Sequence, residues 1–244
     1  MRKPSTLLLL AALVVAGAAC QGHAMDARKA FHDPAVAALA QAAADGDRDA
    51  VRQAVAAGAD PDARGEDQVT PLQFAMLAQS KAGVEALMDT GADASVPGLA
   101  GRTAVHSAAI ADDPGYLRIL LERGADPDAR HGRTGGTALA DAAGPRTDAQ
   151  FGMLLDAGAD PTIADRTGNT PLHVAAMINA GAHVLSLLEH GAPASAKNAQ
   201  DASFQAFYYK LPAEKLSAAA RAERAAVTAW LEANGVPLEA GAAN

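Results

Sequence analysis

The sequence is poor in aromatic residues and has one cysteine, and both shortages limit what the chain can be. Aromatic side chains make up 4% of the 244 residues, whereas hydrophobic ones make up 50%. A core must therefore come from small and aliphatic side chains on closely packed helices. The lone cysteine, Cys20, excludes an intrachain disulfide and a thiolate metal site. No basic excess is present either: the net charge of −8 argues against nucleic acid or an anionic lipid surface as partner.

Signatures of catalysis and metal binding are also missing. The chain has no HExxH motif and no Gly-x-Ser-x-Gly elbow, and its seven histidines show no metal-ligand spacing. The carboxylate pairs at 60–62 and 126–128 recur in step with a repeat described below, which favours a structural role in turns. We therefore expect no enzymatic activity, no cofactor and no metal.

Residues 1–20 have the pattern of a bacterial export signal. Arg2 and Lys3 precede the apolar run Leu7–Val15, which is too short to span a bilayer as a helix, and small residues follow. The end of this segment, Gly17 to Cys20, resembles the lipobox of bacterial lipoproteins, which implies that Cys20 becomes acylated. Cleavage after Ala18, with no lipid, is the alternative. Both interpretations predict a periplasmic protein, either soluble or anchored by Cys20.

The rest of the chain divides into three parts. Residues 21–32 are polar and aperiodic and are expected to form a linker, residues 33–239 carry the repeats, and residues 240–244 form a tail. Because Arg2 and Lys3 lie in the signal, its removal changes the net charge from −8 to −10. That charge is compatible with a basic protein partner. Gln21 directly after the cysteine favours the outer membrane as the site of anchoring.

A repeat with a period of 33 or 34 residues organises the chain. Its unit has an apolar residue that opens one helix and, 19 residues later, a glycine that ends a second helix in a left-handed conformation. The apolar residues are Leu39, Leu72, Val105, Leu139 and Leu172, and the glycines are Gly58, Gly91, Gly124, Gly158 and Gly191. Gly235 is expected to end a sixth unit.

The best-formed unit is Asp165–Pro193, which contains TPLHVAA at 170–176; TAVHSAA at 103–109 and TPLQFAM at 70–76 repeat its first part. These stretches resemble the ankyrin repeat. The resemblance implies an all-α solenoid of helix–turn–helix units with projecting β-turn tips, which binds another protein and is a monomer when free. It also implies that His106 and His173 form hydrogen bonds between repeats.

Two of the six predicted repeats depart from the pattern. In repeat four, Pro145 is expected to cut the first helix short, because proline removes a helical hydrogen bond. In repeat six, Phe207 and Tyr208 stand where the inner repeats have small or apolar residues, and a long helix is predicted over Ala213–Ala233 with Val227, Trp230 and Leu231 inward. Larger side chains can close the end of a solenoid; a special contact patch at Tyr208–Lys210 is the alternative.

In ankyrin proteins the tips and the groove carry recognition. Leu77, Ile110 and Met177 fall in one groove slot, where they are expected to form an exposed apolar stripe suited to a protein partner; the alternative is that they pack between repeats. The candidate partner-binding residues are Glu66, Asp67, Leu77, Arg102, Ile110, Arg133, Arg166, Asn169, Met177 and Tyr209.

Two groups of exported bacterial ankyrin proteins fit the sequence. One consists of immunity proteins that neutralise phospholipase-type effectors of the type VI secretion system, and this chain resembles them in its signal and in the size of its repeat domain. The other consists of periplasmic scaffolds that support a catalase and oxidative-stress defence. The first would act by steric occlusion of a toxin, and the second by recruitment.

Overall fold

Helices form nearly all of the regular structure. The structure is a computed structural model, which describes residues 25–239. Within that part there is no extended strand, only two isolated β-bridges, Arg130 with Thr137 and Lys197 with Ser203. The all-α ankyrin solenoid predicted from the sequence is confirmed. The chain divides into two compact units, each described separately: the first runs to Ala108 and includes Gly115–Asp126, and the second comprises Ala109–Pro114 and the residues from Pro127 onward.

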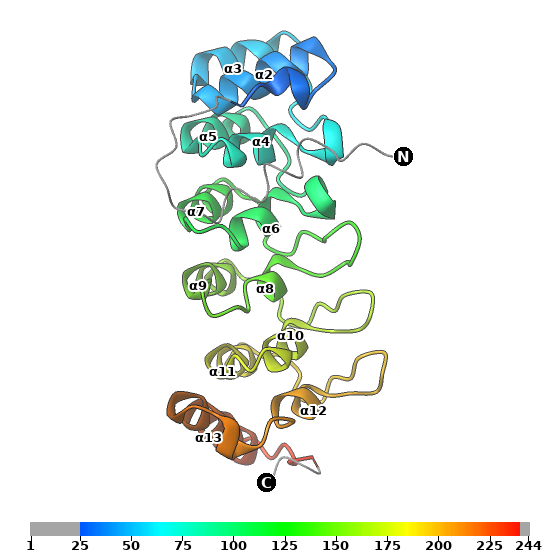
Figure 1. Ribbon diagram of the computed structural model, residues 1–244, viewed down its shortest axis with the longest axis vertical. Helices are drawn as coiled ribbons and strands as arrows, with labels where there is room; N and C mark the ends of the chain where they lie inside the picture. Colours follow the sequence, from blue (N-terminus) through cyan, green and yellow to red (C-terminus); the bar gives the residue numbers. More distant parts are fainter. Residues whose placement is uncertain (1–24, 240–244) are drawn as a thin grey trace. The chain divides into compact units, whose positions relative to one another are not determined.

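Short helices follow one another in pairs within each unit (Figure 1). The first unit contains η2 (Ala27–Lys29), α2 (Pro34–Asp45), α3 (Arg48–Ala56), η3 (Glu66–Gln68), α4 (Pro71–Leu77), α5 (Lys81–Asp89), η4 (Leu99–Gly101), most of α6 (Ala104–Ala109) and α7 (Gly115–Glu122). The second contains α8 (Ala138–Asp141), α9 (Asp148–Asp156), α10 (Pro171–Met177), α11 (Gly181–Glu189), α12 (Phe204–Tyr208), η5 (Ala213–Lys215) and α13 (Ala218–Ala233).

Residues at both ends of the helices explain these boundaries. Thr70 caps α4: its hydroxyl accepts from the Gln73 N–H at 3.3 Å, and Pro71 takes the first helical position. The predicted terminating glycines all have left-handed φ angles, as they must to reverse the chain after a helix; these are Gly58, Gly91, Gly124, Gly158, Gly191 and Gly235. The apolar residues that open the first helices are at most 1% exposed: Leu39, Leu72, Val105, Leu139 and Leu172.

The expectation of a linker over 21–32 is wrong for its described part, residues 25–32. Asp26 caps the 3-10 helix η2, and Ala27, Ala30 and Phe31 are at most 3% exposed in a core cluster. The Phe31 ring meets the Phe74 ring of α4 edge-on, with centroids 5.7 Å apart. Burying one aromatic and two alanines offsets the entropy of ordering the segment, so it packs as the N-terminal cover of the first unit.

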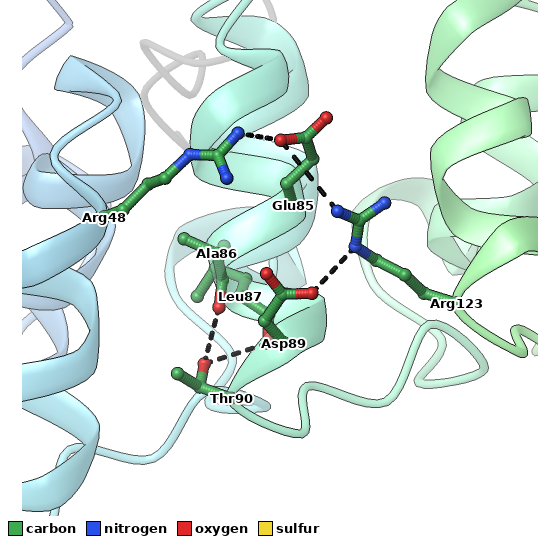
Figure 2. A network of polar contacts seen from close by, with 7 residues as sticks. All are labelled: Arg48, Glu85, Ala86, Leu87, Asp89, Thr90 and Arg123. Carbon is green, nitrogen blue, oxygen red and sulfur yellow. Dashed lines mark hydrogen bonds and ion pairs between the residues drawn. The ribbon is translucent and has the colours of Figure 1, made fainter.

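Ion pairs join the second helices of the first unit (Figure 2). Glu85 in α5 pairs with Arg48 of α3 and lies 3.9 Å from Arg123, whose Nε donates to Asp89 at 2.9 Å. Thr90 caps the C-terminal end of α5, and its hydroxyl donates to the Ala86 and Leu87 carbonyls. Because these charges are partly exposed, each pair contributes at most about 1 kcal/mol.

The last helix closes the second unit. Val227 and Leu231 of α13 are fully buried and Trp230 is half-buried, as predicted, but the long helix begins at Ala218, after the separate turn η5. Tyr208 and Phe204 are at most 1% exposed. These large side chains fill the end of the core in the way expected of a terminal repeat. No helix in residues 25–239 is both long and apolar enough to cross a membrane.

Candidate protein-binding surface

Three exposed apolar side chains of the second unit lie at the ends of helices α6 and α10. Ile110 directly follows α6, Met177 is the last residue of α10, and Ile178 caps that helix. They are 42%, 44% and 50% exposed, whereas the alanine pairs just before them are at most 1% exposed. The chain leaves the helix here, so the side chain after the buried alanines turns to solvent. We call Ile110, Met177 and Ile178 the apolar row.

Buried polar side chains hold the loops that carry the apolar row. The Gln150 amide of α9 donates to the Ala111 carbonyl at 2.6 Å, next to Ile110. The Arg224 guanidinium of α13 donates to Asn179 Oδ1 at 3.3 Å, next to Ile178, and to the Tyr208 carbonyl at 2.8 Å. Because these side chains are at most 8% exposed, their hydrogen bonds fix the loops.

A third clamp of the same kind lies in repeat four. Pro145 follows α8, which has only four residues, so the predicted shortening of this helix is confirmed. His183 of α11 contacts a carbonyl in the loop after α8: its Nδ1 lies 2.9 Å from the Ala143 oxygen. Its Nε2 lies 3.2 Å from Asp148, and its ring stacks on Phe151. We call Gln150, His183 and Arg224 the loop clamps. None was identified as functional from the sequence, although Gln150 and His183 stand one repeat apart in the same slot.

Two predicted groove residues are not exposed. Tyr209, expected at the surface, is 8% exposed; its hydroxyl forms a 2.8 Å hydrogen bond with Thr228 of α13, and burial raises its pKa. Helix α13 therefore covers the position, which argues against a contact patch there. Leu77 is half-buried and packs partly on the cluster around Phe31, so it does not extend the exposed stripe.

Two of the three predicted tip residues of the first unit, Glu66 and Arg102, contact neighbouring residues. Glu66 is exposed and pairs with His32 at 2.9 Å. Asp67 has a left-handed φ of 52° and is half-buried, as is Arg102, whose carbonyl accepts from the Gln73 amide at 2.9 Å. That any of the three binds a partner stays a prediction.

Arginines dominate the tips of the second unit. Arg133 and Arg166 are exposed, and Arg130, which sequence reasoning missed, is exposed beside them. Asn169 differs: its amide donates to Thr167 Oγ1, and its carbonyl accepts from Asn198 at 2.9 Å, so the side chain braces two successive tips. The structure thus brings Arg133 and Arg166 together and gives Asn169 a scaffolding place.

At His173, the histidine slot of the repeat has the hydrogen-bond geometry between repeats that the resemblance implied. His173 is fully buried, its Nδ1 lies 2.8 Å from the Thr170 hydroxyl, and its Nε2 lies 3.1 Å from the Ala202 carbonyl of the next repeat. Burial lowers its pKa. His106 is equally buried and bonds Thr103 of its own repeat at 2.7 Å, so a hydrogen bond from His106 to the next repeat stays a prediction. Residues 25–239 hold no group of three or more side chains placed to bind a metal. Cys20 lies outside the described residues.

Comparison with known proteins agrees with this architecture. A model of three ankyrin repeats matches residues 39–131, and a single-repeat model matches residues 167–201. Protein PhlB of Serratia liquefaciens is 47% identical over 145 residues, which cover 58% of this chain and 62% of PhlB. Human ankyrin repeat and SOCS box protein 16 is 34% identical over 186 residues, covering 73% of this chain and 40% of that protein. The chain thus spans less than two thirds of these relatives.

Solved structures show the same fold. The ankyrin repeat domain of Bcl-3 superposes with a TM-score of 0.62 at 29% identity, covering 69% of this chain and 76% of that one. An ankyrin repeat domain from Acinetobacter baumannii gives a TM-score of 0.61 at 25% identity, covering 80% of this chain and 97% of that one. Ankyrin repeats form binding scaffolds, and no catalytic family matches. The chain belongs to the ankyrin-repeat proteins, and its repeats form a protein-interaction module.

Proposed function

We propose that this chain is an exported bacterial immunity protein that binds one secreted phospholipase-type effector and blocks it by occlusion. The apolar row carries the proposal. Isolated exposed apolar residues are ordinary, but Ile110 and Met177 occupy equivalent helix ends in two repeats, and Ile178 directly follows Met177. Buried polar clamps fix both loops. A surface that is already ordered loses little entropy on binding, which favours tight association.

Occlusion requires no chemistry from the chain. A stable interface buries about 800 Å² on each partner, with an apolar centre and a polar rim. The apolar row supplies the centre, and the charged tips of the second unit supply the rim. A partner whose active-site mouth lies against this surface would lose access to its substrate.

The proposed location is the periplasm, with Cys20 as a lipid anchor in the outer membrane. The basic start, short apolar run and lipobox-like end of residues 1–20 support export. The 47% identity with PhlB of Serratia liquefaciens supports a bacterial setting. An immunity protein placed there would meet an effector on arrival.

The test is capture of the partner, followed by measurement of its activity. The full chain with a C-terminal tag is used to recover proteins from the envelope and secreted fractions of its own cell. Recovery of a phospholipase that loses activity in proportion to added chain would support the proposal. Recovery of a catalase, or of another enzyme that stays active when bound, would replace it with the scaffold function.

A further inference from the structure

Three exposed arginines gather at the tips of repeats four and five in an otherwise acidic protein. Arg130, Arg133 and Arg166 all belong to the second unit and all are exposed. We call them the arginine cluster. The chain as a whole carries 20 basic and 28 acidic side chains, so its overall composition does not account for a local cluster of positive charge.

The loop that carries the arginine cluster is ordered by its own hydrogen bonds. A β-bridge joins Arg130 to Thr137, and the Gly135 N–H donates to the His131 carbonyl at 2.8 Å. His131, 8% exposed, points its Nδ1 at the N–H groups of Arg133 and Thr134, at 3.2 and 3.4 Å. The tip is therefore preformed and would lose little entropy on binding a ligand.

Hydrogen bonds also tie the two tips together. The Arg166 N–H donates to the Thr134 carbonyl at 2.8 Å. A Cβ placed on Gly135 would lie 3.2 Å from Arg166 Cγ and 3.6 Å from an Nη of Arg130, so both side chains flank this glycine. The three arginines thus share one small surface.

Two of the three guanidinium groups in this cluster, those of Arg130 and Arg166, contact carbonyls rather than carboxylates. Arg130 donates to the Ala164 carbonyl at 2.7 Å, and Arg166 donates to the carbonyls of Gly132, at 3.1 Å, and Arg133. No carboxylate in the part of the chain that the structure describes forms an ion pair with any of the three. Neighbouring Asp165 directs Oδ1 to the N–H groups of Thr167 and Asn169, at 2.8 and 2.9 Å. These carbonyls orient the Arg130 and Arg166 guanidinium groups without neutralising their charge.

We propose that the arginine cluster recognises an acidic segment, rich in Asp or Glu, of the protein partner. This inference rests on the proposed function that the chain binds a protein. A planar guanidinium presents paired N–H donors that match a carboxylate, and several oriented ones discriminate strongly for it. The net negative charge of the chain opposes an extended anionic surface, whereas a short acidic peptide can reach one basic tip.

The test uses the full chain, with arginine side chains labelled for NMR and capped hexaglutamate as the probe at low ionic strength. We expect the probe to shift the Nε–Hε signals of Arg130, Arg133 and Arg166 and salt to weaken binding. Arg133→Glu with Arg166→Glu should weaken it at least about tenfold. Arg133→Gln is a milder variant that removes one positive charge and should leave the fold undisturbed, because the Arg133 side chain makes no hydrogen bond within residues 25–239.

The matched control is Arg118→Glu with Lys215→Glu, which makes the same charge change at exposed sites away from the tips. Equal weakening by the control would overturn the inference, since attraction would then depend on net charge alone. Binding of phosphatidylglycerol vesicles through the same arginines, without binding of hexaglutamate, would also overturn it in favour of lipid headgroups.

The two proposals can fail separately. A chain that captures and blocks its partner but ignores hexaglutamate would refute the acidic-segment inference and leave the immunity function intact. A chain that binds hexaglutamate through the arginine cluster but blocks no enzyme would refute the immunity function alone.

Discussion

Replacement of His173 by glutamine should make the protein less sensitive to acid without weakening it at neutral pH. The chain itself contains the precedent, because Gln73 holds the same slot in repeat two. Its Oε1 lies 3.4 Å from the Thr70 N–H and its amide donates to the Arg102 carbonyl at 2.9 Å. His173 makes the same two contacts in repeat five, to the Thr170 N–H at 3.2 Å and to the Ala202 carbonyl at 3.1 Å.

The size of the effect follows from the hydrogen bonds. In the fold, His173 Nδ1 accepts from the Thr170 N–H, so protonation would place a donor against a donor. Its pKa is lowered from 6.5, chiefly by burial. Because the folded state binds this proton more weakly than the unfolded chain does, protonation favours unfolding. The free energy of unfolding therefore has its full value above pH 6.5 and decreases as the pH falls from 6.5 toward the folded-state pKa. The loss has an upper slope of about 1.4 kcal/mol per pH unit.

The assay is urea denaturation of wild type and His173→Gln at several pH values between 8 and 5. At pH 8 we expect the free energies of unfolding to agree within about 1 kcal/mol, because glutamine can restore both hydrogen bonds. Below pH 6.5 the wild type should lose stability relative to the variant. His173→Ala should cost about 2–4 kcal/mol at pH 8, since it leaves a buried carbonyl and N–H unpaired and opens a cavity. A difference between wild type and His173→Gln that stays constant from pH 8 to pH 5 would refute the reasoning.

The remaining predictions concern two glycines and the cysteine. Gly83→Ala should destabilise the protein by about 1–3 kcal/mol in thermal unfolding, because its Cβ would lie 1.8 Å from the Ala43 carbonyl oxygen. Gly152→Ala should instead stabilise the protein by about 0.5–1 kcal/mol, because a Cβ added at this helical position would meet no neighbouring atom within 4 Å. A change in stability of the same sign for both substitutions would contradict the packing described for these two glycines. Cys20→Ser should move the protein from membrane to soluble periplasm in cell fractionation, and wild-type protein that is already soluble would exclude the lipid anchor.

Local chemistry explains why the repeats could be predicted. A glycine that must be left-handed and a leucine that must be buried recur at fixed spacing, and each is decided within its own unit. The solvent exposure of Phe31, Leu77 and Tyr209 depends on segments that pack over these side chains, and those segments are not part of the regular repeat pattern. Tyr209 is buried because α13 covers it, and Phe31 because η2 folds back onto the first repeat.

The loop clamps show a signal that was present but not used. Gln150 and His183 reach carbonyls 39 and 40 residues earlier in the chain, contacts that periodicity alone does not reveal. Gly83 holds the same slot and approaches the Ala43 carbonyl, also 40 residues earlier. In these three repeats the residue at this position is glycine, glutamine or histidine, and it differs according to the loop that it contacts. Comparison of this position across the repeats would have shown that variation.

The apolar row is tested most directly by titrating the captured phospholipase with the full chain and with Ile110→Glu combined with Met177→Glu. Wild type should abolish its activity at a one-to-one ratio, whereas the variant should leave it active while its circular dichroism stays unchanged. Ala149→Glu with Ala182→Glu, two exposed alanines of α9 and α11, serves as control and should inhibit like wild type. Full inhibition by the folded apolar-row variant would contradict the account.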